Sequence, residues 1–292
     1  MLQIFSQTVM SNATSTHSSP YSIESFTHGF DYLHLVLVLV AVVYGFMHLI
    51  HNRKAYIKLF ETRNLRKVWG IKDGDYVNIV CSELDNPEER QTEEPREFIY
   101  TLKYGDIDAY FEVIVTLFYL YPNIKLRMLS AGEAESTRID MSQHLILIGG
   151  PDYNFLTAKI LEKQIAQYNY SSLGKETALY NKQNKKNYYE DTDQRDYGYL
   201  ERIENPDNPK KHIILVGGCH TIGVTGAAKA FSIAGYEQEK ISSVVLENAK
   251  KVAKKISNKQ QFSVLVNVER TGQTISVPIV SIENVLIRNQ EV

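Results

Sequence analysis

Two segments of the sequence combine a buried-strand pattern, a Gly-Gly pair and a short polar turn that leads into a helix pattern. The first is ILIGGPDYNFLT at residues 146–157, and the second is ILVGGCHTIGVT at residues 214–225. Glycine lets the backbone approach a ligand closely, and the first turn of a helix presents unpaired N–H groups and a partial positive charge. The two turns therefore predict a site for a phosphate-containing ligand. Its predicted ligand-binding residues are Gly149, Gly150, Asp152, Asn154, Gly217, Gly218, Thr221 and Gly223.

Close packing of a helix against a sheet is the alternative explanation for these glycines. Gly218, Gly223 and Gly226 have the spacing G-x4-G-x2-G, which matches neither the dinucleotide-binding fingerprint nor a P-loop. Packing alone, however, does not call for the polar and reactive residues that stand in the turns themselves. We therefore take ligand binding as the prediction and keep packing as its alternative.

Three further residues are candidates for chemistry near these turns. Asp106, taken as ligand-binding, stands at the start of a predicted helix with Asp108 in its first turn; capping of the helix explains one of these carboxylates, and the other could hold a ribose hydroxyl. Glu83 ends the first predicted strand and is a candidate for acid–base or nucleophilic catalysis, with an ordinary surface glutamate as the alternative. His220 is a candidate catalytic residue beside Cys219, although a small buried thiol in the turn explains Cys219 without catalysis.

The composition argues against a metal site, a cofactor and a nucleic-acid partner. The eight histidines are scattered, and the two cysteines, Cys81 and Cys219, can form neither a disulfide framework nor a four-ligand zinc site. Free thiols are typical of a reducing compartment. Lys and Arg (32) nearly balance Asp and Glu (34), which gives a net charge of −2 and no surplus of positive charge for a polyanion.

Alternating strand and helix patterns must position these residues. Strands are predicted at 76–84, 124–130, 144–150 and 212–218, and helices at 107–121, 154–168 and 241–256. This alternation predicts an α/β fold over residues 75–292, with a Rossmann-like, mostly parallel sheet and helices on both faces. The carboxyl ends of parallel strands meet at one edge, so we expect the two Gly-Gly turns to lie there together.

An insertion rich in Tyr, Asn, Lys and Asp interrupts this domain at residues 170–211. A structureless loop of this length is unusual in a compact domain, so a hairpin is predicted within it, with Tyr197–Ile203 as a strand. The insertion is either a solvated surface element or a flap over the ligand site, with tyrosines that stack on a base.

A stretch of 19 residues without Asp, Glu, Lys or Arg, Tyr32–Ile50, precedes the domain. As a helix it would span roughly 28 Å, which predicts a single transmembrane helix. Residues 1–31 are predicted to form a flexible non-cytoplasmic tail, and residues 51–74 a juxtamembrane connector. Because Arg53, Lys54 and Lys58 directly follow the stretch, the main domain is predicted to be cytoplasmic, on the inner membrane of the cell.

The layout over Tyr76–Ala234 resembles two groups of proteins. It is similar to the Rossmann-like modules that bacteria tether to a membrane helix in nucleotide-signalling and antiviral systems. The turn IGGPDYN at residues 148–154 resembles the strand-then-Gly-Pro turn of nucleoside deoxyribosyltransferase-like proteins. The second resemblance implies a catalytic carboxylate, for which Glu83 is the candidate by position.

Two functions follow from these observations. In the first, the domain binds a nucleotide or nucleotide-derived signal and couples it to the membrane helix through homo-oligomerisation. In the second, it is a tethered enzyme that cleaves an N-glycosidic or phosphate bond in such a ligand. Binding is the preferred prediction, because no complete set of catalytic residues can be named from the sequence.

Overall fold

The computed structural model describes most of the chain after residue 52 and a short helical stretch before it. The described residues are 37–45, 47–48, 53–83, 104–173, 176–190, 194–233, 241–256, 261–272 and 274–288. The chain divides into two units, residues 1–58 and residues 59–292. The tail predicted for residues 1–31 lies outside the described residues.

The predicted transmembrane helix is wrong. Within Tyr32–Ile50 the structure describes helix only at residues 37–45 and 47–48. A helix needs about 20 consecutive, mostly apolar residues to cross the hydrocarbon core of a bilayer. Among the described helices, none combines that length with that apolar character. The next helix, α2 (Arg53–Trp69), has 17 residues and carries Lys, Arg and Glu along its length.

Helix α2 covers most of the predicted connector, and its end belongs to the core of the second unit. Leu65, Val68 and Trp69 are fully buried there. The buried guanidinium group of Arg202 donates hydrogen bonds to the carbonyl oxygens of Lys67 and Val68, at 2.7 and 3.0 Å. This satisfies carbonyl groups that a helix end would otherwise leave unpaired, and it ties α2 to the sheet.

One eight-stranded sheet organises the second unit, in the order β10-β9-β7-β8-β3-β1-β2, with β11 also beside β9. Its strands are β1 (Tyr76–Cys81), β2 (Lys125–Ser130), β3 (His144–Ile148), β7 (Arg195–Asn205), β8 (Asn208–Gly218), β9 (Gln261–Thr271), β10 (Thr274–Ile275) and β11 (Val285–Arg288). The neighbours from β8 through β3 and β1 to β2 are parallel. All pairs on the other side of β8 are antiparallel.

The prediction of a mostly parallel sheet is therefore wrong, because the sheet is mixed. A two-residue connection, Pro206 and Asp207, joins β7 to β8. So short a connection can only join antiparallel strands, since parallel strands need a crossover of a dozen or more residues. The predicted strand Tyr197–Ile203 lies inside β7 and stands between β8 and β9 in the sheet.

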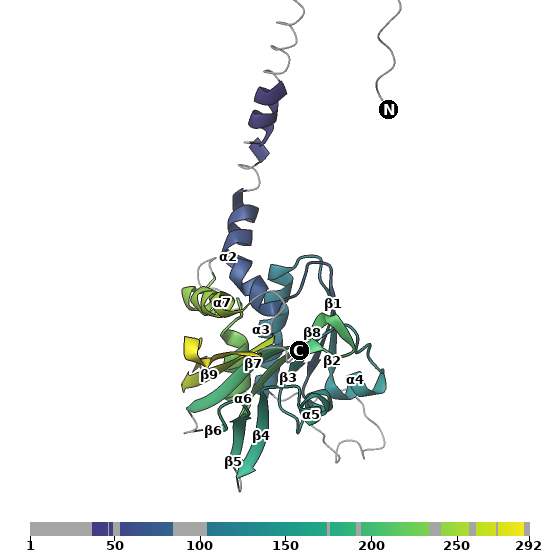
Figure 1. Ribbon diagram of the computed structural model, residues 1–292, viewed down its shortest axis with the longest axis vertical. Helices are drawn as coiled ribbons and strands as arrows, with labels where there is room; N and C mark the ends of the chain where they lie inside the picture. Colours follow the sequence, from purple (N-terminus) through teal and green to yellow (C-terminus); the bar gives the residue numbers. More distant parts are fainter. Residues whose placement is uncertain are drawn as a thin grey trace, which may run out of the picture. The chain divides into compact units, whose positions relative to one another are not determined.

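Helices cover both faces of this sheet. Helices α3 (Tyr104–Leu120), α6 (Thr221–Lys229) and α7 (Ser243–Lys255) share one apolar cluster with the end of α2. Helices α4 (Ala131–Ser136) and α5 (Phe155–Glu162) pack in a second cluster on the other face. Figure 1 shows α7 and the β4–β5 pair on opposite sides of the sheet.

The predicted insertion contains a separate three-stranded antiparallel sheet, β4-β5-β6, as well as β7. Its strands are β4 (Tyr168–Leu173), β5 (Glu176–Asn181) and β6 (Lys186–Tyr189). Tyr168 and Leu179 are buried in the same apolar cluster as α4 and α5. The small sheet is thus packed against the main sheet, and the insertion is more than a solvated loop.

Candidate functional site

The two Gly-Gly turns lie side by side at the carboxyl edge of the parallel strands. Ile148, the last residue of β3, is level with Cys81 of β1 and Val216 of β8. The backbone N–H of Gly149 donates to the carbonyl oxygen of Val216 at 2.9 Å. Because β1 leads toward α3 on one face and β3 leads to α5 on the other, this edge is a topological switch point, where α/β sheets bind ligands.

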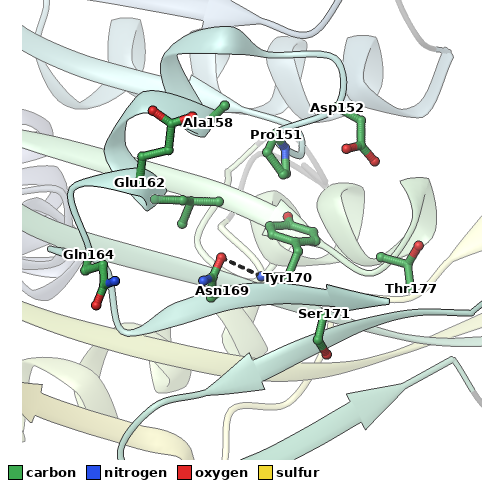
Figure 2. Close-up of a pocket in the computed structure, with 10 residues that line it drawn as sticks. Pro151, Asp152, Ala158, Glu162, Gln164, Asn169, Tyr170, Ser171 and Thr177 are labelled. Carbon is green, nitrogen blue, oxygen red and sulfur yellow. Dashed lines mark hydrogen bonds between the residues drawn. The ribbon is translucent and has the colours of Figure 1, made fainter. Parts of the chain in front are cut away.

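A pocket of about 450 Å³ opens beside this edge. It lies between the turn after β3, helix α5 and the strands β4 and β5. Its lining consists of Pro151, Asp152, Ala158, Leu161, Glu162, Gln164, Asn169, Tyr170, Ser171 and Thr177. Figure 2 shows the ring of Tyr170 facing Pro151, with Asp152 and Thr177 toward one end and Glu162 and Gln164 toward the other.

The charges of this lining do not suit a phosphate group. Asp152 and Glu162 are its charged residues, and both are acidic. The remaining polar groups are amides and hydroxyls. Carboxylates accept hydrogen bonds from hydroxyl and amino groups and repel other anions. The pocket is therefore suited to a neutral or cationic ligand that offers several hydrogen-bond donors.

Tyr170 connects this pocket to the Gly-Gly turns. A Cβ atom added at Gly150 would lie 3.6 Å from its ring, and one added at Gly217 would lie 2.7 Å from its hydroxyl oxygen. The ring also makes an edge contact with Tyr199, at 6.3 Å between centroids. Among the described residues, neither tyrosine hydroxyl oxygen has a hydrogen-bond partner, although both are buried. Burial raises the pKa of Tyr170 well above its usual value, so the ring is a neutral wall.

Asn154 and Asp106 are brought to the same edge, where both make bonds within the protein. The amide of Asn154 donates to the carbonyl oxygens of Val80 and Ile148, and its oxygen accepts from the N–H of Thr157 as the N-cap of α5. Asp106, in the first turn of α3, accepts a 2.6 Å hydrogen bond from the hydroxyl of Ser82. Both side chains are buried, and their contact with a ligand stays a prediction.

The amino-terminal end of α6 already holds an anion, the side chain of Asp196. One carboxylate oxygen accepts from the N–H groups of Gly223 and His220, at 2.6 and 3.1 Å. The other oxygen accepts from the N–H of Tyr197 at 2.7 Å. The group is fully buried, and burial raises its pKa to about 6. Asp196 thus takes the place at this helix end that the Gly-Gly pattern predicted for a phosphate.

The glycines around α6 allow close packing. A Cβ atom at Gly218 would lie 2.5 Å from the backbone nitrogen of Val224, and one at Gly223 would lie 2.3 Å from the carbonyl oxygen of Tyr197. A Cβ at Gly226 would meet Val268 on β9 at 2.3 Å. We therefore expect a side chain at any of these three positions to lower the free energy of unfolding. Thr221 is the first residue of α6, and His220 is the N-cap, without a side-chain capping bond.

The two candidate catalytic residues have separate partners. Glu83 accepts a 2.8 Å hydrogen bond from the N–H of Gly132 at the start of α4. The ring nitrogen Nε2 of His220 lies 3.0 Å from a carboxylate oxygen of Glu190, and neither His220 nor Glu83 belongs to the pocket lining. The thiol of Cys219 donates to the carbonyl oxygen of Tyr188, and burial raises its pKa to about 12, so it is a neutral thiol and no nucleophile.

Sequence reasoning missed Asp196 and Glu201, and it offered tyrosines of the insertion over the ligand site as one alternative without singling out Tyr170. The signal for Tyr170 was the tyrosine-rich composition of the insertion, whereas nothing local distinguishes Asp196 from the other acidic residues of the same segment. No protein-family model matches this chain, and no curated protein matches it either. Its function must therefore be inferred from the geometry of the site.

Glu201 predicts a pH dependence of stability. It is buried on β7, and its carboxylate accepts from the N–H groups of Gln167 and Tyr168, where the chain enters β4 and the pocket wall. Burial raises its pKa from 4.5 to about 7. A carboxyl group with a raised pKa binds its proton more tightly in the folded state than in the unfolded state. The contribution of this proton to the free energy of unfolding is therefore fully present below pH 4.5 and is lost as the pH rises through 7.

We expect the free energy of unfolding to fall by up to about 3 kcal/mol over this interval because of Glu201. Urea unfolding of the wild type and of Glu201→Gln between about pH 4.5 and 7.5 measures the effect. Asp196 titrates in both proteins and cancels in the difference. Parallel pH profiles of the two proteins would contradict the assignment to Glu201.

Proposed function

We propose that the α/β domain binds a nucleotide-type small molecule through its nucleoside part, in the pocket between α5 and the β4–β5 pair. The observation that carries this proposal is the position of the pocket beside the carboxyl edge, with an aromatic wall and a polar lining. Its volume of about 450 Å³ is within the usual range for small-molecule sites.

Each part of a nucleoside has a counterpart in the lining. The ring of Tyr170 and the ring of Pro151 offer flat surfaces for a base. Asp152 is exposed at one end and suits the hydroxyl groups of a sugar, because a carboxylate accepts two such donors. The acidic lining and the occupied end of α6 both argue that a phosphate, if present, points away from the pocket.

Calorimetric titration of the full chain with nucleosides and their monophosphates tests this proposal. We expect at least one nucleoside to bind, and its monophosphate to bind no more tightly. Asp152→Ala should weaken binding by about 10-fold or more, since a hydrogen bond to a charged group contributes about 1.5–3 kcal/mol. Glu247→Ala on α7 is the matched control, because it removes an exposed carboxylate outside the lining.

Equal affinity of the wild type and the Asp152→Ala protein would overturn the assignment of this pocket. Binding of a nucleotide in strict dependence on its phosphate would instead favour a site outside it. Thermal melting of each variant checks that the fold is retained.

A second candidate function rests on the presence of two carboxylates in one pocket. Asp152 and Glu162 both line it, and cleavage of a glycosidic bond uses a pair of carboxyl groups. If the chain cleaves an N-glycosidic bond, incubation with the bound nucleoside releases the free base, which chromatography detects. If Glu162→Gln still binds the nucleoside but no longer releases the base, the result would support hydrolysis. If the nucleoside stays intact after incubation with the wild type, the pocket binds it without cleaving it.

A further inference from the structure

The loop between α5 and β4, residues 163–167, carries one end of the pocket. Gln164 of this loop lines the pocket, and Asn169 and Tyr170 follow it on β4. Figure 2 shows the chain running from Gln164 through Asn169 to the ring of Tyr170. Gln164 has a φ of +55°, in the left-handed region that residues other than glycine rarely adopt. The position of Tyr170 as a wall of the pocket therefore depends on how this loop is held.

Two basic side chains hold the carbonyl groups of the loop. The ammonium group of Lys182 donates to the carbonyl oxygens of Gln164 and Ala166, at 3.3 and 2.7 Å. The guanidinium group of Arg288 donates to the carbonyl oxygen of Ile165, which lies between these two in the chain. Three successive carbonyl groups are thus bound by two side chains from outside the loop.

A carboxylate holds the N–H groups of the same segment. Glu201 accepts from the N–H groups of Gln167 and Tyr168, one on each of its oxygens. The peptide group that joins Ala166 to Gln167 is therefore bound at both ends. Lys182 binds its oxygen, and Glu201 binds its N–H. When Glu201 is ionised, above its pKa of about 7, both bonds are to charged groups, which fixes the direction of this peptide dipole.

The three charged side chains come from three different segments of the chain. Lys182 directly follows β5, Glu201 lies in β7, and Arg288 is the last residue of β11. The lining of the pocket includes none of the three. They can act on the pocket only through the loop and through β4, which the loop leads into.

Satisfaction of the backbone does not by itself account for these charges. Water can bind the carbonyl groups of a surface loop, so no charged side chain is needed for that purpose. Burial lowers the pKa of Lys182, because its ammonium group gives up part of its hydration at this place. A charged group that binds two carbonyl groups at once fixes their directions, which separate water molecules do not. The arrangement therefore favours a loop of fixed geometry.

We propose that Lys182, Glu201 and Arg288 are positioning residues of the pocket, which hold the α5–β4 loop in the conformation that presents Tyr170 to the ligand. A wall that is already in place spares the ligand the free energy of ordering it. This inference rests on the nucleoside site proposed above, and it adds residues outside the lining on which the affinity of that site depends.

Lys182→Met tests the proposal, because it removes the ammonium group and keeps an unbranched stem. The full chain is titrated by calorimetry with adenosine, guanosine, cytidine and uridine in turn, at about pH 8, where Glu201 is ionised. For the nucleoside that the wild type binds, Lys182→Met should weaken affinity by about 10-fold or more. Lys182→Arg keeps donors for the carbonyl groups and should stay within about 3-fold of the wild type. Lys185→Met is the matched control, because Lys185 is exposed in the same β5–β6 turn.

Amide hydrogen exchange, read by NMR without ligand, measures the loop itself. In Lys182→Met the N–H groups of Gln167 and Tyr168 should exchange at least about 10-fold faster, while that of Leu215 in the core strand β8 keeps its wild-type rate. Unchanged exchange at Gln167 and Tyr168 would overturn the inference. Faster exchange with unchanged affinity would also overturn it and would leave the nucleoside site standing. A wild type that binds none of the four nucleosides would overturn the proposed function, and the positioning role with it.

Discussion

Alanine at Gly149 should lower the free energy of unfolding by about 3–5 kcal/mol, because two unfavourable effects act at this position. Gly149 has a φ of +98°, in the region that favours glycine. A Cβ atom there would lie 1.7 Å from the hydroxyl oxygen of Ser82 and 2.7 Å from a carboxylate oxygen of Asp106. Ser82 and Asp106 are both buried and bonded to each other, so neither can move away without breaking that bond.

The neighbouring glycine is a matched control for this prediction. A Cβ atom at Gly150 would meet only the ring of Tyr170, at an ordinary contact distance of 3.6 Å, and its φ is outside the left-handed region. Gly150→Ala should therefore change stability by less than about 1 kcal/mol. Urea unfolding of the two variants side by side measures both values. Similar stabilities of Gly149→Ala and Gly150→Ala would contradict the close contact of a Cβ atom at position 149 with Ser82.

Removal of the carboxylate of Asp196 should have an effect of comparable size. Asp196→Ala leaves the N–H groups of Tyr197, His220 and Gly223 without their acceptor at the start of α6. A buried donor that loses its partner costs about 1–3 kcal/mol, and the three are not independent, so we expect a loss of about 3–5 kcal/mol. The measurement belongs at about pH 7.5, where Asp196, with its pKa of about 6, is ionised.

Two variants calibrate this result. Asp196→Asn keeps one oxygen but turns an NH2 group toward backbone donors. Its free energy of unfolding should therefore fall between those of the wild type and of Asp196→Ala. Asp207→Ala removes an exposed carboxylate in the β7–β8 turn and should remain within about 0.5 kcal/mol of the wild type. A stable Asp196→Ala protein would mean that water or another group can satisfy the end of α6, and the helix end would again be open to a phosphate.

These two predictions also separate folding from binding at the Gly-Gly turns. Gly149, Gly218 and Gly223 each lie against buried atoms of the protein, so substitutions there are expected to lower the free energy of unfolding. Asp152, by contrast, is exposed beside the pocket, so its substitution is the one expected to weaken ligand affinity without changing stability. Ligand affinity and stability measured on the same variants keep the two roles apart.

The sequence by itself located the local elements of this protein. Its apolar runs mark β1, β3 and β8, and its two Gly-Gly pairs mark the points where β3 and β8 end. It also indicated Tyr197–Ile203 as a strand within the polar insertion. These features depend on short-range properties, namely the burial period of a strand and the turn preference of glycine, which can be recognised in any short window.

The tertiary structure decided every property that depends on residues far apart in the chain. The mixed sheet begins with the local β7–β8 hairpin, but its extent depends on the pairing of β7 with β9, about 65 residues later, and hydropathy carries no information on that partner. The apolar stretch Tyr32–Ile50 met the hydropathy criterion, which counts side chains but does not establish that they form one continuous helix. In α3, apolar residues occur on both sides, and only the contacts with the sheet reveal that Phe111, Val115 and Phe118 face outward.

The same holds for the charges of the site. Asp196 belongs to a segment full of acidic and basic residues, and its sequence neighbours give it no special mark. It becomes the cap of α6 because the pairing of β7 with β8 carries it to the end of a helix that begins 25 residues later. A carboxylate responds to the N–H groups and the dielectric around it, and both are set by the packed chain, so the pKa and the role of Asp196 could only be read from the fold.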